Sequence, residues 1–590
     1  MAAGAARGPN FAVLVALAWL VIAIDLVVKH WTGTALTLSD TDDAMRLVEV
    51  KDFLHGQGWF DMHQPRLAPP LGYDSHWSRL IDAGLAGLYL VFHNFVDGAL
   101  AERLMRVVWP LLWLIPAILG VAAIAWRIAG RDAAVVSLLL SVVGLPAFQQ
   151  FLPGRIDHHN AQIALAVALV AATVWSDRSR RASVAAGALT GLALAIGLEN
   201  IAFVALCGAA FALRFAVDRA GADALARYGW SLAAGSVVAF FVIVGPDRWG
   251  RAECDAIAIN WALAVAMAGL LTGVAATLFA SVRAAVRIGA VGVSAVAAGL
   301  VFVLIEPRCL AGPFGMMDPD LRAIWLSHIS EMQPLTEISR NAPPVAATLA
   351  AFPAVAAVVT LLLAHELRRD FGFLVAGGVL LVACVLTVMV AKMSMYAMWL
   401  GIPLVAAFSL RMFARLHIEN LAARAFAAML LTPAVLSAFA IAAVQAAGSP
   451  PARERDTRVL AGCFNTASYA QLARLPMGVI AAEPDFGSFI LALTPHAVVA
   501  APYHRLAGGI IAAHRMFTTP PEEARKVLQQ LGATYVVTCG KRVPPGMSEQ
   551  EREASLWGRL QGGAPPEWLT PLPPAPGDVF AVYRIGANAP

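Results

Sequence analysis

Apolar residues along the chain gather into runs of roughly 16–25 residues that are separated by short polar segments. Runs of this length predict helices that cross the hydrocarbon of a bilayer, whereas a β-barrel would show short alternating segments. A shorter apolar stretch, 83–97, predicts a helix that lies at the membrane interface. The predicted spans, about thirteen in number, are 11–28, 104–126, 132–151, 161–175, 182–198, 201–217, 228–245, 259–280, 286–305, 344–364, 371–391, 395–413 and 421–446.

Arginines in the predicted loops give the chain a sidedness. They occur between 127 and 131, 178 and 181, 214 and 219, 283 and 287, 368 and 369, and 411 and 415, all on one side if 83–97 does not cross. By the positive-inside rule that side is cytoplasmic. The first long loop (29–82), the segment around Asp157, the late loop (306–343) and the C-terminal part then face outward.

The composition changes near residue 449. The segment 449–455 predicts a linker, and 449–590 predicts a small α/β domain on the outer face, with buried strands at 478–482 and 533–538 and an amphipathic helix over 521–531. Cys463 and Cys539 both lie in this part, where a disulfide and two unpaired buried thiols are both compatible with the sequence.

Composition supports the membrane interpretation. Of the 590 residues, 59% are hydrophobic and 14% are charged, and the mean hydropathy is +0.68, which excludes an ordinary soluble protein. The net charge of +4 without a basic block argues against nucleic-acid binding. The predicted fold class is an α-helical polytopic membrane domain (1–448) followed by the α/β extracytoplasmic domain.

Acidic side chains stand in three of the outward-facing segments. The first loop carries Asp40, Asp42 and Asp43, and the late loop carries Glu331. Between two apolar runs stands the segment 154–160, Gly-Arg-Ile-Asp-His-His-Asn, which is either a short polar loop or a functional motif. Acids that converge repel one another unless they share a cation or take up protons. Convergence therefore predicts bound Mg²⁺ or Mn²⁺ with oxygen-rich ligation.

The order of these features resembles a known family. The first helix, an acidic motif with an arginine six residues on, a GRxDHH-like motif, a late Ser-Glu-x-Gln-Pro-like motif and an outer C-terminal domain look like the catalytic subunit of oligosaccharyltransferase. That family has the GT-C fold of membrane glycosyltransferases, and the resemblance spans nearly the whole chain.

The resemblance implies roles residue by residue. Asp40, Asp157 and Glu331 match catalytic residues, and Asp42 and His159 join these three as metal ligands. Arg46, Arg155 and Lys392 are the candidates for binding the donor phosphate. The implied reaction moves a sugar or oligosaccharide from a polyprenyl-(pyro)phosphate-linked donor to an unknown acceptor, at the outer face of a bacterial inner membrane.

The sequence departs from the family at two places. The acceptor-reading WWDYG motif is absent, and the chain has Glu483-Pro484-Asp485-Phe486-Gly487 there, which puts protein N-glycosylation in doubt. Tyr396 stands at the approximate place of an arginine near the donor phosphate. Lys392, one turn earlier, either supplies this charge or is an interfacial lysine whose side chain reaches toward water.

Other interpretations stay open from the sequence. Asp485, Tyr503 and His504 are candidate acceptor-binding residues, and the last two also fit a surface turn. Arg155 either binds phosphate or caps its loop. A transporter or flippase of lipid-linked saccharides is the alternative function, although the chain shows few charges within helices and no repeat. A non-catalytic GT-C relative is a third hypothesis.

Overall fold

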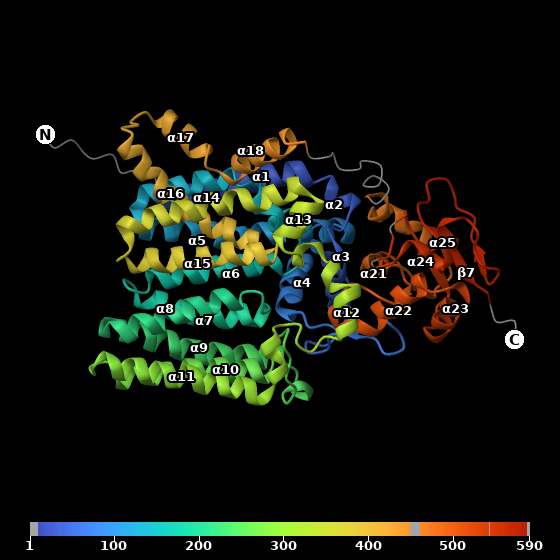
Figure 1. The fold of residues 1–590 in the computed structure, drawn as a ribbon, viewed down its shortest axis with the longest axis horizontal. Helices are drawn as coiled ribbons and strands as arrows, with labels where there is room; N and C mark the ends of the chain where they lie inside the picture. Colours follow the sequence, from blue (N-terminus) through green and yellow to red (C-terminus); the bar gives the residue numbers. More distant parts are fainter. Residues whose placement is uncertain (1–9, 449–460, 542, 545, 587–590) are drawn as a thin grey trace.

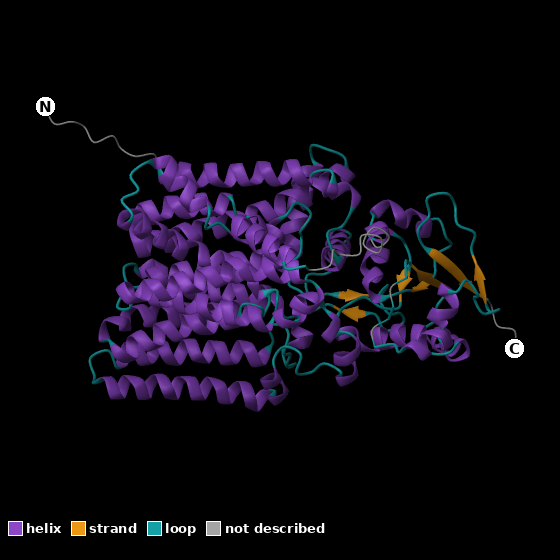
Figure 2. Cartoon of the chain, turned by 45° about the horizontal axis from the view of Figure 1, so that its top comes forward, coloured by secondary structure: helices purple, strands orange, loops and turns teal. Residues whose placement is uncertain are grey.

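The computed structural model describes residues 10–448, 461–541, 543–544 and 546–586. Long helices lie side by side in a bundle, and the C-terminal residues form a smaller unit beyond one end of it (Figure 1). Most strands lie in that smaller unit (Figure 2). The long helices are α1 (Phe11–His30), α5 (Gly98–Val142), α6 (His159–Trp175), α7 (Arg180–Ile196), α8 (Ile201–Val217), α9 (Ala222–Ile243), α10 (Ile259–Leu278), α11 (Ala284–Ile305), α14 (Pro343–Leu367), α15 (Phe371–Met389) and α16 (Met393–Arg415).

Three predicted spans have different shapes from those expected. The ranges 104–126 and 132–151 belong largely to α5, whose 45 residues are interrupted at Ala129 and Gly130, where φ of Gly130 is 83°. The range 421–446 forms α17 (Leu421–Met429) and α18 (Pro433–Ala446), which meet at 52°. Pro433 lacks an amide hydrogen and disfavours a helical conformation at the residue before it, so one straight helix cannot form here.

The described helices make this a polytopic membrane protein. Eight of them are long and apolar enough to cross a membrane, or up to nine if α17 and α18 form one span. The 45-residue α5 is one of the eight, and α6 and α8 are shorter apolar helices. The count of about thirteen spans therefore stays a prediction. So does the interfacial position of α4 (Arg79–His93), which packs against α3 (Thr41–Leu54) and α5.

The C-terminal part contains a five-stranded mixed sheet in the order β4-β3-β5-β7-β6. Its strands are β3 (Val479–Ala481), β4 (Ala497–Val498), β5 (Tyr535–Thr538), β6 (Leu569–Pro571) and β7 (Ala581–Ile585). β3 runs parallel to β4 and β5, and β7 runs antiparallel to β5 and β6. Both predicted strands and the predicted helix, α23 (Pro521–Gln530), are confirmed. The predicted linker, 449–455, lies outside the described residues.

Shorter elements connect these parts. The loop 29–82 contains α2 (Gly33–Leu36), α3, β1 (His63–Gln64) and β2 (Tyr73–Asp74). The late loop contains η4 (Pro307–Ala311), α12 (Pro319–Ile324), η5 (Leu326–His328), η6 (Ser330–Met332) and α13 (Leu335–Asn341). The remaining elements are η1 (Leu145–Phe151), η2 (Arg219–Gly221), η3 (Pro246–Arg248), η7 (Thr466–Tyr469), α20 (Ala470–Ala473), α21 (Pro484–Leu493), η8 (His504–Leu506), α22 (Ala507–Thr518), α24 (Glu549–Ala554) and α25 (Leu556–Gln561).

The C-terminal sheet is joined to the first loop. Arg66 donates hydrogen bonds to the carbonyls of Leu491, Thr494 and His496 at 3.0–3.3 Å. Next to it, Ala68 N donates to Val498 O at 2.7 Å. One hydrophobic core contains buried residues from α3, α4 and the C-terminal sheet together. This shared core fixes the C-terminal part over the beginning of α3.

Two disulfides hold segments outside the long helices. Cys463 and Cys539 are joined, which settles the question that the sequence left open. A second disulfide, Cys254–Cys309, was not predicted and ties the loop before α10 to the start of the late loop. Cysteine pairs of this kind persist in oxidising compartments.

Candidate active site

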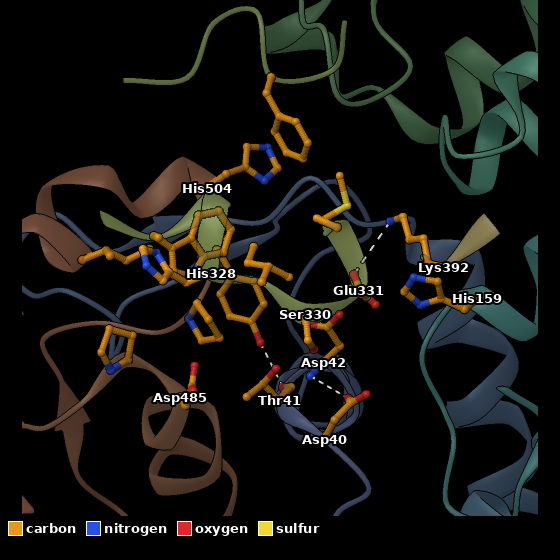
Figure 3. A pocket seen from close by; sticks show the side chains of 18 of the residues that line it. Asp40, Thr41, Asp42, His159, His328, Ser330, Glu331, Lys392, Asp485 and His504 are labelled. Atoms are coloured by element: carbon orange, nitrogen blue, oxygen red, sulfur yellow. Dashed lines mark hydrogen bonds and ion pairs between the residues drawn. The ribbon is translucent and has the colours of Figure 1, made fainter. Parts of the chain in front are cut away.

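A cavity of about 890 Å³ lies where the helix bundle meets the C-terminal unit. Its walls come from the start of α3, the segment before α6, the α7–α8 turn, the late loop, the start of α16 and the tail. Figure 3 shows Asp42, Glu331, Lys392 and His159 around one space. The three acidic segments that the sequence separates by up to about 290 positions thus share one cavity.

Asp40 begins α3. One of its carboxylate oxygens accepts hydrogen bonds from the amides of Asp42 and Asp43, each at 3.0 Å, which is the usual role of an aspartate at a helix N-cap. The other oxygen pairs with Arg155. Asp42, two residues on, projects into the cavity (Figure 3). Burial raises its pKa well above the usual range, and the charges of Asp157, Asp40 and Glu331 add to this effect.

Asp43 links α3 to the segment before α6, a role that the sequence did not suggest. One oxygen accepts from the amides of Ile156 at 2.6 Å and Asp157 at 3.0 Å. The other lies 2.9 Å from the Arg155 guanidinium. Backbone shape contributes too, because Gly154 has φ of +104° and a Cβ there would lie 2.8 Å from Ser39 Oγ. Asp43 and Gly154 therefore hold Asp157 against α3.

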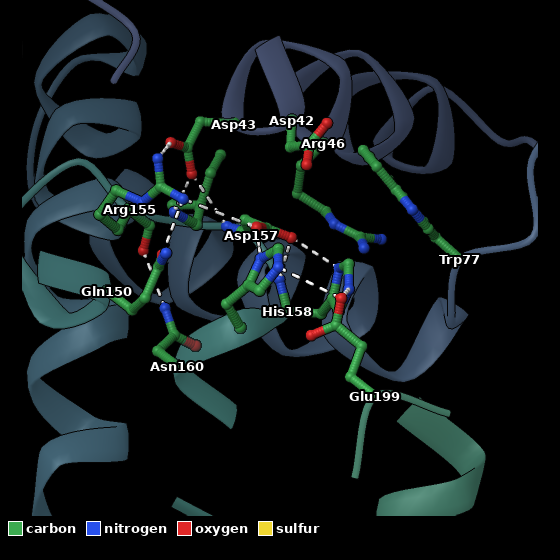
Figure 4. Close-up of polar contacts among 12 residues, drawn as sticks. Asp42, Asp43, Arg46, Trp77, Gln150, Arg155, Asp157, His158, Asn160 and Glu199 are labelled. Atoms are coloured by element: carbon green, nitrogen blue, oxygen red, sulfur yellow. Dashed lines mark hydrogen bonds and ion pairs between the residues drawn. The ribbon is translucent and has the colours of Figure 1, made fainter. Parts of the chain in front are cut away.

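Asp157 is buried at the centre of this arrangement (Figure 4). One carboxylate oxygen pairs with His159 Nδ1, and the other lies 2.6 Å from His158 Nδ1. The two imidazole rings stack with centroids 4.6 Å apart. Burial alone would raise the pKa of Asp157, but the two histidines hold it well below the usual range. Asp157 is thus an ionised carboxylate next to two imidazoles.

Glu199 completes the polar wall. It stands in the α7–α8 turn, and one carboxylate oxygen lies 3.3 Å from His159 Nε2 and 2.6 Å from Lys392 Nζ. Burial would raise the pKa of Glu199, but His159 and Lys392 hold it well below the usual range. Sequence reasoning missed Glu199, which belongs to no motif. Only an acidic residue on the side predicted to face outward could have suggested it.

Lys392 faces the cavity. Its ammonium lies 3.8 Å from Glu331 as well as 2.6 Å from Glu199, and its side chain is 16% exposed. Lys392 N also donates to Glu331 O at 3.0 Å, which docks the late loop on the start of α16. The interpretation of Lys392 as an interfacial lysine is therefore wrong. Tyr396, one turn further, is buried outside the cavity lining.

Arg46 is not placed where the phosphate-binding role requires. Its side chain is fully buried in ion pairs with Glu49 at 3.0 Å and Asp82 at 2.6 Å. Its guanidinium lies 4.5 Å from the centre of the Trp77 ring, and Trp77 lines the cavity. The prediction for Arg46 is corrected accordingly, because helix geometry turns the residue six positions after Asp40 into the core. It positions Trp77.

The remaining predicted residues do line the cavity. Arg155 is ion-paired with Asp40 and Asp43 and is 11% exposed. Asp485 stands at the start of α21, where Gly487 is required because a Cβ would lie 2.0 Å from Ala500 O. Tyr503 donates a hydrogen bond to Thr41 O at 2.9 Å. His504 pairs with Asp255 at 2.5 Å, so it belongs to a partly buried cluster in the cavity wall and not to a surface turn.

The donor atoms suit a divalent cation. Ligand atoms of Asp157, His158 and His159 lie within 4.8 Å of one another. Buried His159 Nε2 has no hydrogen-bond partner among the described residues, although Glu199 is near. Asp42 and Glu331 add carboxylates close enough for their charges to act on one another. The three carboxylates of Asp157, Asp42 and Glu331 outnumber the two imidazoles, and such a set fits Mn²⁺ or Mg²⁺.

Comparison with known proteins gives similarity in structure alone. No protein-family model matches the chain, and no curated sequence does. The archaeal oligosaccharyltransferase AglB from Archaeoglobus fulgidus, solved with an inhibitory peptide and a dolichol-phosphate, superposes with a TM-score of 0.66 at 14% identity, over 90% of this chain and 69% of that one. The oligosaccharyltransferase of Archaeoglobus fulgidus, solved with Zn and sulfate, gives 0.60 at 16% identity, over 97% and 73%.

At these identities the likeness establishes the fold. It covers both the helix bundle and the C-terminal part, since 90% of the chain or more superposes. The resemblance found from the order of the motifs is confirmed at this level. The chain has the GT-C fold of membrane glycosyltransferases.

Proposed function

We propose that this protein is a membrane glycosyltransferase that moves a sugar or oligosaccharide from a polyprenyl-(pyro)phosphate-linked donor to an acceptor. One observation carries the proposal. Asp42, Asp157 with His159, and Glu331 come from three distant segments and meet Lys392 in one cavity. An acidic pocket that also presents a buried ammonium suits a phosphorylated donor with an associated cation.

The binding site for the cation is formed by this chain's own side chains. Asp157 and His159 provide ionised oxygen and imidazole nitrogen, with Asp42 and Glu331 as further carboxylates. Asp43 fixes Asp157, and Glu199 faces the free nitrogen of His159. When bound, a divalent cation would neutralise the charge that develops on the leaving phosphate oxygen.

The other side chains that line the cavity bind the donor or orient the acceptor. Lys392 offers its ammonium to the donor phosphate, from the same space into which Glu331 projects (Figure 3). A carboxylate of the acidic centre orients the attacking group of the acceptor, and can accept its proton. Asp485 and Tyr503 line the wall on the tail side, where an acceptor would enter. Since the tail begins α21 with Glu-Pro-Asp-Phe-Gly, we propose an acceptor other than a protein sequon.

The orientation is part of the proposal. Both disulfides lie in the segments proposed to face outward, and disulfides persist outside the cytoplasm. Together with the arginine-rich loops on the opposite side, they support an active site on the outer face of a bacterial inner membrane. The archaeal relative in the structural comparison was solved with a dolichol-phosphate, and a polyprenyl phosphate is the corresponding ligand proposed here.

A turnover assay tests the proposed function. Purified protein is incubated with a panel of short polyprenyl-phosphate- and pyrophosphate-linked sugars, and release of the polyprenyl phosphate is measured with and without Mn²⁺. We expect metal-dependent release from at least one donor, and a loss of at least about 100-fold in Asp157→Asn. Release of polyprenyl phosphate that changes neither with Mn²⁺ nor with this substitution would contradict the proposal. Movement of intact donor across vesicles without release would favour the transporter.

A further inference from the structure

A second cluster of metal-binding side chains lies in the same cavity. His76, Asp255 and His504 each offer a ligand atom, and these atoms lie within 4.8 Å of one another. The three residues come from separate segments: the loop between β2 and α4, the loop before α10 and the start of η8. The Cys254–Cys309 disulfide stands next to Asp255 and fixes its loop.

The three side chains lie close together and are only partly paired with one another. His504 Nε2 lies 2.5 Å from Asp255 Oδ2, and the rings of His76 and His504 lie 4.8 Å apart. His76 Nδ1 is buried without a hydrogen-bond partner in the described part of the chain. The side chains of His504 and Asp255 are 14% and 11% exposed. The ion pair with Asp255 accounts for the position of His504. It does not account for the buried Nδ1 atom of His76, which has no hydrogen-bond partner among the described residues.

The surroundings favour a cation. Arg505 donates to both oxygens of Asp255, at 2.7 Å from Nε and 2.6 Å from Nη2, and also pairs with Glu253 at 2.5 Å. Two carboxylates and one guanidinium leave one net negative charge beside the two imidazoles. Arg505 also fixes the orientation of the Asp255 carboxylate, as outer partners of metal ligands do.

We propose that His76, Asp255 and His504 bind a divalent transition-metal ion of the Zn²⁺ type. Two imidazole nitrogens and one carboxylate oxygen are a donor set that such ions prefer, whereas Mg²⁺ and Ca²⁺ require oxygen. With three protein ligands, a fourth position faces the cavity. The site joins three outer segments over the cavity and is distinct from the oxygen-rich centre at Asp157, so it goes beyond the proposed function.

Cobalt binding tests the site, because Co²⁺ replaces Zn²⁺ and absorbs visible light. The full-length protein in detergent is stripped of metal and titrated with Co²⁺, and the Asp157→Ala variant, which lacks the central carboxylate of the acidic centre, is titrated alongside. We expect one Co²⁺ per chain in Asp157→Ala. Its visible bands are expected to be lost when His504→Ala or His76→Ala is combined with Asp157→Ala.

The control is His514→Ala, since His514 lines the same cavity outside the cluster. Wild-type protein without a saturable cobalt spectrum would overturn the proposal. So would a spectrum that is lost in Asp157→Ala and kept in both cluster variants. His76→Ala is the decisive variant if His504→Ala fails to fold, because the Nδ1 atom of His76 makes no hydrogen bond among the residues described. Size-exclusion chromatography establishes that each variant is folded.

Discussion

The Lys392 ammonium lies 2.6 Å from the Glu199 carboxylate, although the two residues are 193 positions apart. The same glutamate oxygen faces His159 at 3.3 Å, and the same ammonium faces Glu331 at 3.8 Å. These ion pairs connect the proposed cation ligands with the one lysine that lines the cavity within the described residues. A donor phosphate entering here would meet a lysine already held in place.

Removing the Lys392 charge is expected to weaken the use of the donor. A charged hydrogen bond contributes about 1.5–3 kcal/mol, so Lys392→Met should lower kcat/KM for the donor about 10- to 100-fold. Steady-state kinetics of polyprenyl phosphate release measure the effect. Lys51→Met is the control, since Lys51 forms a half-exposed ion pair with Glu102 outside the cavity. Equal kcat/KM in both variants would rule out a phosphate role for Lys392.

Asp43 is expected to be a structural residue of the site. Asp43→Ala leaves two amides and the Arg155 guanidinium without their carboxylate. Breaking one partner of a buried ion pair costs about 3–5 kcal/mol, so a large fall in melting temperature should follow. Asp74→Ala, which removes a 66% exposed carboxylate, should change the free energy of unfolding by less than about 1 kcal/mol. The melting temperatures of the two variants are compared by thermal unfolding in detergent. An Asp43→Ala variant with the melting temperature of the wild type would refute the anchoring role of Asp43.

Glu49 gives the protein a pH-dependent stability. Burial and the neighbouring Asp82 raise the pKa of Glu49 to about 7, despite its pairing with Arg46. The folded state therefore keeps a proton that the unfolded state loses near pH 4.5, and stability should fall as the pH rises from about 4.5 to about 7. Melting temperatures across this range should fall less in Glu49→Gln than in the wild type. If the melting temperatures of the two proteins change equally with pH, Glu49 is ionised in the folded state throughout this range.

Sidedness has a direct test as well. Alkaline phosphatase, which is active only outside the cytoplasm, should be active when fused after residue 590 and inactive when fused in the loop between α6 and α7, next to Arg178. This result follows from the position of the arginines and from the two disulfides. The reverse pattern would place the cavity on the cytoplasmic side.

Sequence reasoning located the long helices because apolar runs of membrane length are local signals. It missed the bend between α17 and α18, where Pro433 marks the break, and the short strands β4 and β6, whose two and three residues carry too little pattern. The segments that meet at the cavity were identified because acids of this kind recur on one predicted side. The sequence pattern near each residue could not predict which side chains lie together in the cavity.

Arg46 and Glu199 illustrate this limit of local patterns. The spacing of Arg46 from Asp40 matched a family motif, but the rotation of α3 and its packing on α4 bury the guanidinium against Asp82. Glu199 carried no motif, and the packing of the α7–α8 turn beside α16 brings it to Lys392. Both positions depend on tertiary packing, which a single sequence does not display.

The central claim is that acids from distant segments form one cation site. Mn²⁺ binding to the purified protein, measured by electron paramagnetic resonance in the presence of a polyprenyl phosphate, tests it most directly. We predict that the wild type immobilises one Mn²⁺ per chain, and that Asp42→Ala and Asp157→Ala, from segments 115 positions apart, each abolish this binding while remaining folded. Wild-type protein that binds no Mn²⁺, or variants that bind it as the wild type does, would contradict the account.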